Sequence, residues 1–161
     1  MTNVARAGGK SAAALTFAGD LAKGLVPVLI GRAAGMTPGG LAAVAFAAFV
    51  GSIASIFLKF KGGRGVATSL GLWIGLAPWP VAIAAGVFAA IVAISRIVSL
   101  ASIGAAIAIV PAVAAAGCPR PYLLLAIAVS SLVLLRHRAN IGRLMAGEER
   151  RIGDRKRQPT G

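Results

Sequence analysis

The chain has 161 residues, of which 58% are hydrophobic and only 13% are charged. Its mean hydropathy of +0.86 lies far outside the range of ordinary soluble domains. The charged side chains comprise 17 basic and 4 acidic residues, which gives a formal net charge of +13. These values exclude a water-soluble fold and indicate an integral membrane protein whose cations face anionic lipid, an anionic substrate or the inner membrane surface.

Six apolar runs are separated by glycine, proline or basic residues. Each is apolar on all sides instead of at alternate positions, which is typical of helices in lipid and excludes a transmembrane barrel. The sequence therefore predicts an all-α polytopic membrane bundle of about six transmembrane helices. The runs cover residues 12–34, 39–58, 66–78, 80–95, 97–117 and 121–136.

The run from 66 to 95 is interrupted at Pro78-Trp79-Pro80, and it forms either one tilted span or two short ones. With six spans and a cytoplasmic C-terminus, 14 basic residues lie on the inner side and 2 on the outer side. With five spans, 10 basic residues lie on the inner side and 6 on the outer side. The positive-inside rule favours the six-span topology with both ends in the cytoplasm. Trp79 is then expected at the outer interface.

The chain has a single cysteine, Cys118, and a single histidine, His137. One cysteine excludes an internal disulfide and a thiolate metal cluster, and one histidine excludes a multi-histidine metal site. We therefore expect no metal and no cofactor. Nucleic acid is not an expected partner, because the apolar runs leave no room for a soluble binding domain.

A glycine-rich basic loop opens directly into the third apolar run. Its glycines allow close approach of backbone amides to a ligand, and the helix N-terminus and two cations favour phosphate. The spacing does not fit a nucleotide-binding loop. The alternative is a flexible basic turn that obeys the positive-inside rule. The candidate phosphate-binding residues here are Lys61, Gly62, Gly63, Arg64 and Gly65.

Three further pairs of polar residues share a helical face, being three positions apart. Asp20 and Lys23 form either a structural ion pair or a ligand site. His137 and Asn140 are either helix-end residues or part of an active site. Ser99 and Ser102 either face a substrate or donate hydrogen bonds to their own helix. These pairs occupy residues 20–23, 99–102 and 137–140.

These motifs, in this order, resemble the bacterial acyl-phosphate:glycerol-3-phosphate acyltransferases of the PlsY type. The resemblance extends from Thr2 to Glu149. It is carried by Phe60 to Thr68, by Asp20 with Lys23-Gly24, by the segment Arg96 to Ile103, and by His137 to Leu144 with Gly147-Glu148.

The resemblance implies a seven-helix enzyme of the bacterial inner membrane, multi-pass, with its active site on the cytoplasmic side. It implies transfer of a fatty acyl group from acyl phosphate to glycerol 3-phosphate, which gives lysophosphatidic acid and phosphate. Residues 1–149 would form the transmembrane acyltransferase domain and residues 150–161 a basic cytoplasmic tail. Membrane lipid is the expected partner, and a monomer is the expected state.

Matching the family's motifs onto this sequence assigns the site residue by residue. The Thr-Asn-x-x-Arg pattern places Asn3 in phosphate binding and Arg6 in catalysis. The glycine-rich motif supports the phosphate-binding role of residues 61–65. The serine segment and the final motif assign catalytic roles to Ser99, Ser102, His137 and Asn140, and a structural role to Glu148.

The sequence departs from the family pattern in two places. Gly51-Ser52 stands where the family has Gly-His, with Ser55 at the position of a proline. The chain also begins at Met1 in the middle of the Thr-Asn motif, so we expect the natural protein to carry one more helix before it. Two non-enzymatic alternatives remain: a degenerate, non-catalytic family member and a small anion-binding membrane transporter.

Overall fold

The computed structural model describes residues 2–54 and 64–154. Seven helices form in these two segments, and no strand is found in them, which confirms the all-α prediction. Six of the helices follow the six apolar runs, and the seventh is a short basic helix after His137. They are α1 Thr2–Ala33, α2 Pro38–Ile53, α3 Val66–Leu76, α4 Pro78–Ser95, α5 Val98–Ala115, α6 Arg120–Arg136 and α7 Arg138–Met145.

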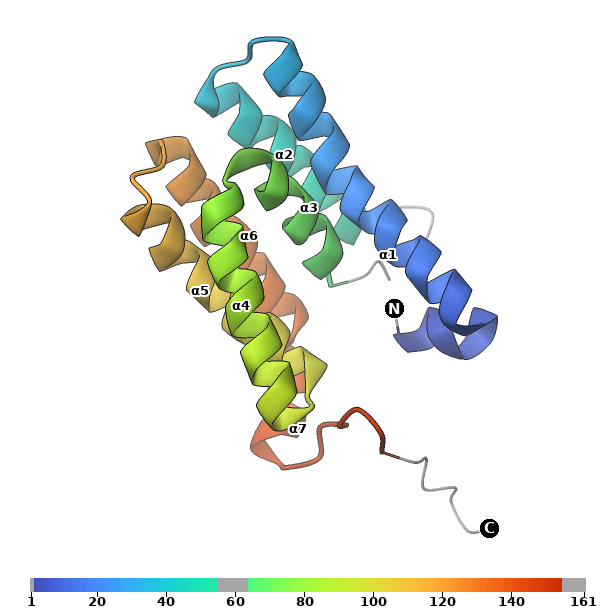
Figure 1. Cartoon of the computed structure of the whole chain (residues 1–161). Coiled ribbons are helices and arrows are strands. Elements are labelled where there is room, and N and C mark those ends of the chain that lie inside the picture. The colour runs from blue at the N-terminus through green and yellow to red at the C-terminus, as the bar shows by residue number, and fades with distance from the viewer. Residues whose placement is uncertain (1, 55–63, 155–161) are drawn as a thin grey trace, which may run out of the picture.

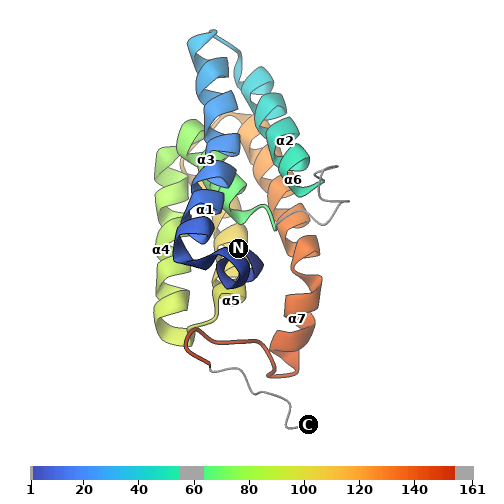
Figure 2. The same cartoon turned by 90° about the vertical axis from the view of Figure 1, so that its right-hand side faces the viewer.

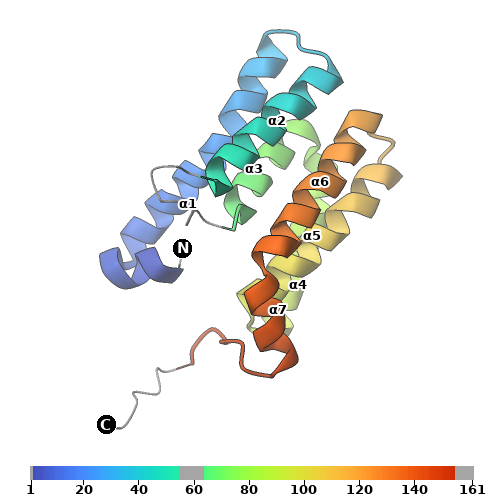
Figure 3. The ribbon, with the colours of Figure 1, turned by 180° about the vertical axis from the view of Figure 1, so that it is seen from behind.

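The helices form two groups that pack side by side. α1 packs most extensively against α3 and also contacts α2, whereas α4 and α6 both pack against α5. Contacts of α2 with α6 and of α3 with α4 join the groups, as Figures 1 and 3 show. The turns that follow α1, α3 and α5 lie at one end of the bundle. The α4–α5 turn and α7 lie at the other, which we call the polar end (Figure 2).

The interruption at the prolines separates two helices, as the six-span prediction requires. Ala77 has extended backbone angles, with φ −150° and ψ 81°, because a residue before proline is kept out of the helical region. The Arg32 guanidinium at the end of α1 donates a hydrogen bond to the Gly75 carbonyl at 2.6 Å. This contact satisfies a carbonyl that the broken helix leaves without its usual amide partner.

The helices differ in whether they are long enough to cross a bilayer. Three segments of the described chain are long and apolar enough, namely 11–33, 78–95 and 98–115, and a fourth arises if α6 and α7 count as one bent span. α2 has 16 residues and α3 only 11. At 1.5 Å per residue, α3 extends across only about half of a hydrocarbon core. The six apolar runs thus form six helices of unequal length, and not all of them are long enough to cross the bilayer.

The crossing of α1 and α3 is very close. A Cβ atom built on Gly24 would collide with the Thr68 carbonyl, and one built on Gly71 would collide with the Leu21 carbonyl. Apolar burial does not drive the association of helices in lipid. Close dispersion contacts drive it instead, and small residues such as these glycines allow the helices to make them. This crossing places the start of α3, and with it Arg64 and Gly65, beside the first helix.

Candidate functional site

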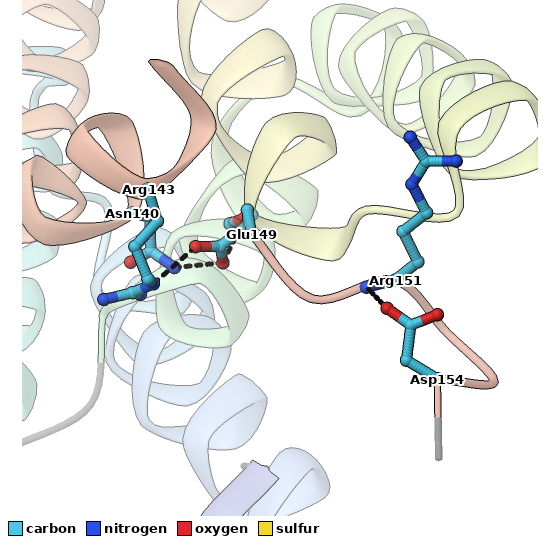
Figure 4. A network of polar contacts seen from close by, with 6 residues as sticks. Asn140, Arg143, Glu149, Arg151 and Asp154 are labelled. Atoms are coloured by element: carbon cyan, nitrogen blue, oxygen red, sulfur yellow. Dashed lines mark hydrogen bonds and ion pairs between the residues drawn. The ribbon is translucent and has the colours of Figure 1, made fainter. Parts of the chain in front are cut away.

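The polar end contains a compact hydrogen-bonded cluster centred on the carboxylate of Glu149. The Ser99 hydroxyl donates to Oε1 at 2.8 Å, the Asn140 amide nitrogen donates to the same oxygen at 2.6 Å, and Arg143 Nε donates to Oε2 at 2.7 Å. Figure 4 shows Asn140 and Arg143 of α7 turned toward Glu149. The cluster joins the start of α5, α7 and the segment that follows α7, which are far apart in sequence.

The three hydrogen bonds determine the charge of Glu149. Burial alone raises the pKa of this carboxyl group, but the donors Asn140, Ser99 and Arg143 outweigh that effect. The pKa of Glu149 therefore lies below its ordinary value, and the group is ionised at neutral pH. Its side chain is 10% exposed, so this anion is largely shielded from water.

The structural role that the final motif assigns to Glu148 stays a prediction, and the structure adds the neighbouring glutamate to the cluster. Glu148 is exposed, and it is Glu149 that contacts Ser99 and Asn140. Gly147, with φ 70°, reverses the chain after α7, so that the second of the two adjacent glutamates points back into the bundle. Spacing in the sequence cannot show which of two neighbouring glutamates in a loop faces the bundle, so the role of Glu149 could not be predicted.

The segment after α7 is held at further points of the polar end. The Ile152 amide donates to the Arg96 carbonyl at the α4–α5 turn, at 2.7 Å. The Arg151 amide donates to the Asp154 carboxylate at 2.9 Å, as Figure 4 shows. Three residues of the predicted tail thus contact the bundle or one another, namely Arg151, Ile152 and Asp154. Residues 155–161 lie outside the described part of the chain.

His137 lies at the junction of α6 and α7 and is only 1% exposed. Its Nδ1 is 2.8 Å from the Val133 carbonyl oxygen, and a carbonyl only accepts hydrogen bonds, so Nδ1 carries a proton. Nε2 is buried without a partner among the described residues. The backbone N–H of Asn140 donates to the backbone carbonyl of His137 at 2.8 Å, so the two residues lie on one helical turn. A neutral imidazole here presents Nε2 as a free acceptor.

The structure separates the two serines that share a face of α5. Ser99 belongs to the Glu149 cluster. Ser102, one turn further into the bundle, donates to the Val98 carbonyl at 2.9 Å and lines an apolar cavity of about 190 Å³. Val66 and Val133 also line this cavity, and they lie next to Gly65 and one turn before His137 respectively. The cavity therefore begins one turn from the polar cluster.

The described part of the glycine-rich loop is Arg64 and Gly65, because Lys61, Gly62 and Gly63 lie outside the described residues. Gly65 has φ 76° and is packed against the Phe49 ring, so neither the backbone angle nor the space admits a side chain. It precedes α3, whose first turn has no side-chain cap. Arg64 is exposed at this helix start, close enough to Glu149 for their opposite charges to interact.

The remaining predicted residues lie on α1. Asp20 Oδ1 accepts a hydrogen bond from Lys23 Nζ at 2.9 Å, and the two form an ion pair along one face of the helix. Asn3 and Arg6 lie in the turns before Gly9, where α1 is interrupted by a φ of 76°. Their side chains are outside the described part of the structure, so their proposed roles stay predictions.

Comparison with known proteins places these features in a family. The family model described as glycerol-3-phosphate acyltransferase matches residues 1–147. A protein of Thioalkalivibrio sulfidiphilus named glycerol-3-phosphate acyltransferase is 44% identical to this chain, and the match covers 96% of this chain and 76% of the relative. In Rubrobacter xylanophilus such a protein is 48% identical, over 95% of this chain and 77% of the relative.

Two crystal structures of PlsY (YgiH), an integral membrane glycerol 3-phosphate acyltransferase, have the same fold. Both match with a TM-score of 0.88 and 39% identity over 94% of this chain. The glycerol 3-phosphate form is covered to 76% of its length and the lysophosphatidic acid form to 78%. On the match over residues 1–147 and the identities above 40%, this chain belongs to the glycerol-3-phosphate acyltransferase family, and it is an integral membrane protein.

Proposed function

We propose that this chain transfers a fatty acyl group from acyl phosphate to glycerol 3-phosphate, giving lysophosphatidic acid and inorganic phosphate for phospholipid synthesis. The observation that carries the proposal is the polar cluster of Ser99, Asn140, Arg143 and Glu149, which lies one helical turn from an apolar cavity lined by Ser102. The transfer joins an apolar acyl chain to a polar phosphate ester, so its active site needs a polar region beside an apolar one.

The phosphate groups are bound by cations and amides at the start of α3. Arg64 and the uncapped amides of this helix present positive charge at one point, and the predicted loop residues 61–63 directly precede them. Arg143, 43% exposed on α7, adds a second guanidinium. Asn3 and Arg6 are proposed to complete the site from the start of α1.

The acyl chain occupies the apolar cavity between α3, α4, α5 and α6. Its walls are almost entirely aliphatic and aromatic, including Trp73, Phe88 and Ile109. These walls are as apolar as the surrounding lipid tails, so a long acyl chain can enter the cavity from the membrane without losing an apolar environment. The carboxyl end of the chain then lies near Ser102, at the mouth of the cavity that faces the cluster.

The reaction requires a hydroxyl of glycerol 3-phosphate to attack the acyl carbonyl. A carbon–oxygen ester bond forms, the bond from the acyl carbon to the phosphate oxygen breaks, and the hydroxyl proton passes to the departing phosphate. His137 Nε2 accepts the hydrogen bond of the attacking hydroxyl and orients it. Acyl phosphate is an activated mixed anhydride, so orientation and charge neutralisation suffice, and no serine nucleophile is required.

The polar end is proposed to face the cytoplasm of the bacterial cell, with the chain spanning the inner membrane. Among the residues that the structure describes, six arginines lie at this end, which fits the positive-inside rule: Arg96, Arg136, Arg138, Arg143, Arg150 and Arg151. We propose a transmembrane domain of residues 1–149, followed by a basic tail of residues 150–161. The chain is proposed to act as a monomer.

A transfer assay on the purified protein in detergent tests the proposal. Labelled palmitoyl phosphate and glycerol 3-phosphate should give labelled lysophosphatidic acid, whereas palmitoyl-CoA should give none. Product formed from acyl-CoA alone would refute acyl phosphate as the donor. Binding of glycerol 3-phosphate without any product from either donor would favour a non-catalytic family member or a transporter.

The variant Asn140→Ala tests whether the cluster is part of the active site. We expect turnover to fall roughly 10²-fold, the scale of losing one preorganised polar group at a reacting centre. The matched control is Arg138→Ala, an exposed residue of the same helix, which should retain turnover. If a folded Asn140→Ala protein turned over within a few fold of the parent, Asn140 would have a role in helix packing and none in catalysis.

A further inference from the structure

The ionised carboxylate of Glu149 determines the direction of the hydrogen bonds around it. A carboxylate only accepts hydrogen bonds, so the Ser99 hydroxyl proton must point at Oε1. For the same reason Asn140 must direct its NH₂ group, and not its carbonyl oxygen, toward Glu149. Arg143 stabilises the negative charge from the other side through Oε2. Ser99 and Asn140 are therefore both held as hydrogen-bond donors to Glu149.

Because Ser99 and Asn140 both donate to Glu149, only their acceptor atoms remain for a ligand. The single proton of Ser99 is engaged, so its oxygen offers only lone pairs. The carbonyl oxygen Oδ1 of Asn140 points away from Glu149 and has no donor among the described residues. Buried Nε2 of His137, on the same turn, is a third acceptor without a partner. Ser99, Asn140 and His137 thus present hydrogen-bond acceptors to the site, whereas Arg143, on the other oxygen of Glu149, presents donors.

A set of acceptors selects a ligand group that donates. A phosphate dianion has no proton to donate and is repelled by these lone pairs, so it is directed to the guanidinium groups of Arg64 and Arg143 and to the start of α3. A hydroxyl group is the donor that glycerol 3-phosphate offers, and it offers two. A single carboxylate thereby separates a region that binds hydroxyl groups from a region that binds phosphate.

We propose that Glu149 is a positioning residue that holds Ser99 and Asn140 as acceptors for the middle hydroxyl of glycerol 3-phosphate, while the terminal hydroxyl binds His137 Nε2. This inference rests on the proposed function and adds the determinant of acceptor selectivity to it. Glu149 acts through its neighbours and does not itself contact the reacting atoms.

The test compares glycerol 3-phosphate with 3-hydroxypropyl phosphate, which keeps the phosphate and the terminal hydroxyl but lacks the middle one. The parent protein should prefer glycerol 3-phosphate by about tenfold or more in kcat/KM, because the analogue leaves buried acceptors unpaired. In Glu149→Gln, whose amide can donate to Ser99, the preference should fall to within about threefold. KM for acyl phosphate should stay unchanged.

The matched control is Glu148→Gln, which removes the same charge from the exposed neighbouring residue and should keep the preference of the parent. A folded Glu149→Gln protein with the parent's preference would overturn the proposal. Should Glu149→Gln not fold, Ser99→Ala removes one of the two acceptors alone and should reduce the preference in the same way. An undiminished preference in that variant would equally overturn it.

The same comparison is made by binding, as the shift in unfolding temperature that each phosphate produces. A parent protein that binds both phosphates but transfers no acyl group would refute the proposed function. The difference in binding between glycerol 3-phosphate and its analogue, with and without Glu149→Gln, would still decide the role of Glu149. The two failures are therefore distinguishable.

Discussion

Single residues of the polar end are coupled through charge, and Glu149 shows this most clearly. Its hydrogen bonds to Asn140, Ser99 and Arg143 hold the pKa of the carboxyl below its ordinary value of 4.5. A group whose pKa is lowered on folding stabilises the folded state above the pKa of the unfolded chain. That stabilisation is lost as the pH falls through the lower pKa of the folded state.

We therefore expect the stability of the parent protein to fall in acid partly through Glu149. Unfolding temperatures in detergent should differ most between the parent and Glu149→Gln at neutral pH. The difference should shrink as the pH falls below 4.5, because the parent carboxylate is then being protonated. Glu148→Gln should show no such pH-dependent difference. A constant gap between parent and Glu149→Gln from neutral to acid pH would contradict this account.

At this scale the sequence brought together some residues of the polar cluster but not all of them. Helical spacing brought His137 and Asn140 together, because residues three apart share a face. The choice between Glu148 and Glu149 depended on a reversal of the chain at Gly147, and this is a loop conformation that spacing does not determine. The different surroundings of Ser99 and Ser102 likewise depended on neighbouring helices.

At the scale of helices, the close crossing of α1 and α3 carries a prediction. Gly24→Ala and Gly71→Ala each place a methyl group against a backbone carbonyl of the other helix. Because backbone cannot move aside as a side chain can, the helices must separate, and we expect each variant to lose about 1–3 kcal/mol of stability. Thermal unfolding of the purified proteins measures the loss.

The control for this crossing is Gly86→Ala in α4, where a Cβ atom meets nothing within 4 Å. This variant should be neutral or slightly more stable, because alanine favours a helix over glycine. Equal unfolding temperatures for Gly71→Ala, Gly86→Ala and the parent would show that α1 and α3 do not cross as closely as described.

At the scale of the whole molecule, the distribution of charge predicts the orientation in the membrane. Arg96, Arg136, Arg138, Arg143, Arg150 and Arg151 lie at the polar end, whereas Arg32 and Arg120 lie toward the opposite end. Cys118, in the turn between α5 and α6, is also at the opposite end and is partly exposed. We expect the polar end and both chain termini to face the cytoplasm.

Labelling with a membrane-impermeant maleimide tests this orientation. Cys118 should react in spheroplasts without permeabilisation, whereas a cysteine introduced by Glu148→Cys in a Cys118→Ser background should react only after permeabilisation. A reporter fused after Gly161 should behave as cytoplasmic. External reactivity of the cysteine at position 148 would reverse the topology and move the proposed active site to the other face.

The sequence by itself determined the membrane class, the helical content and the break between residues 76 and 78. These follow from local physics, because each backbone segment in lipid must satisfy its own hydrogen bonds and proline acts on its immediate neighbours. Only the tertiary structure decided that α3 is a short helix packed on α1, that Ser102 belongs to a cavity, and that Glu149 organises the polar cluster. Those features depend on contacts between Ser99, Asn140 and Glu149, or between Gly71 and Leu21, whose separation along the chain leaves no periodic signal.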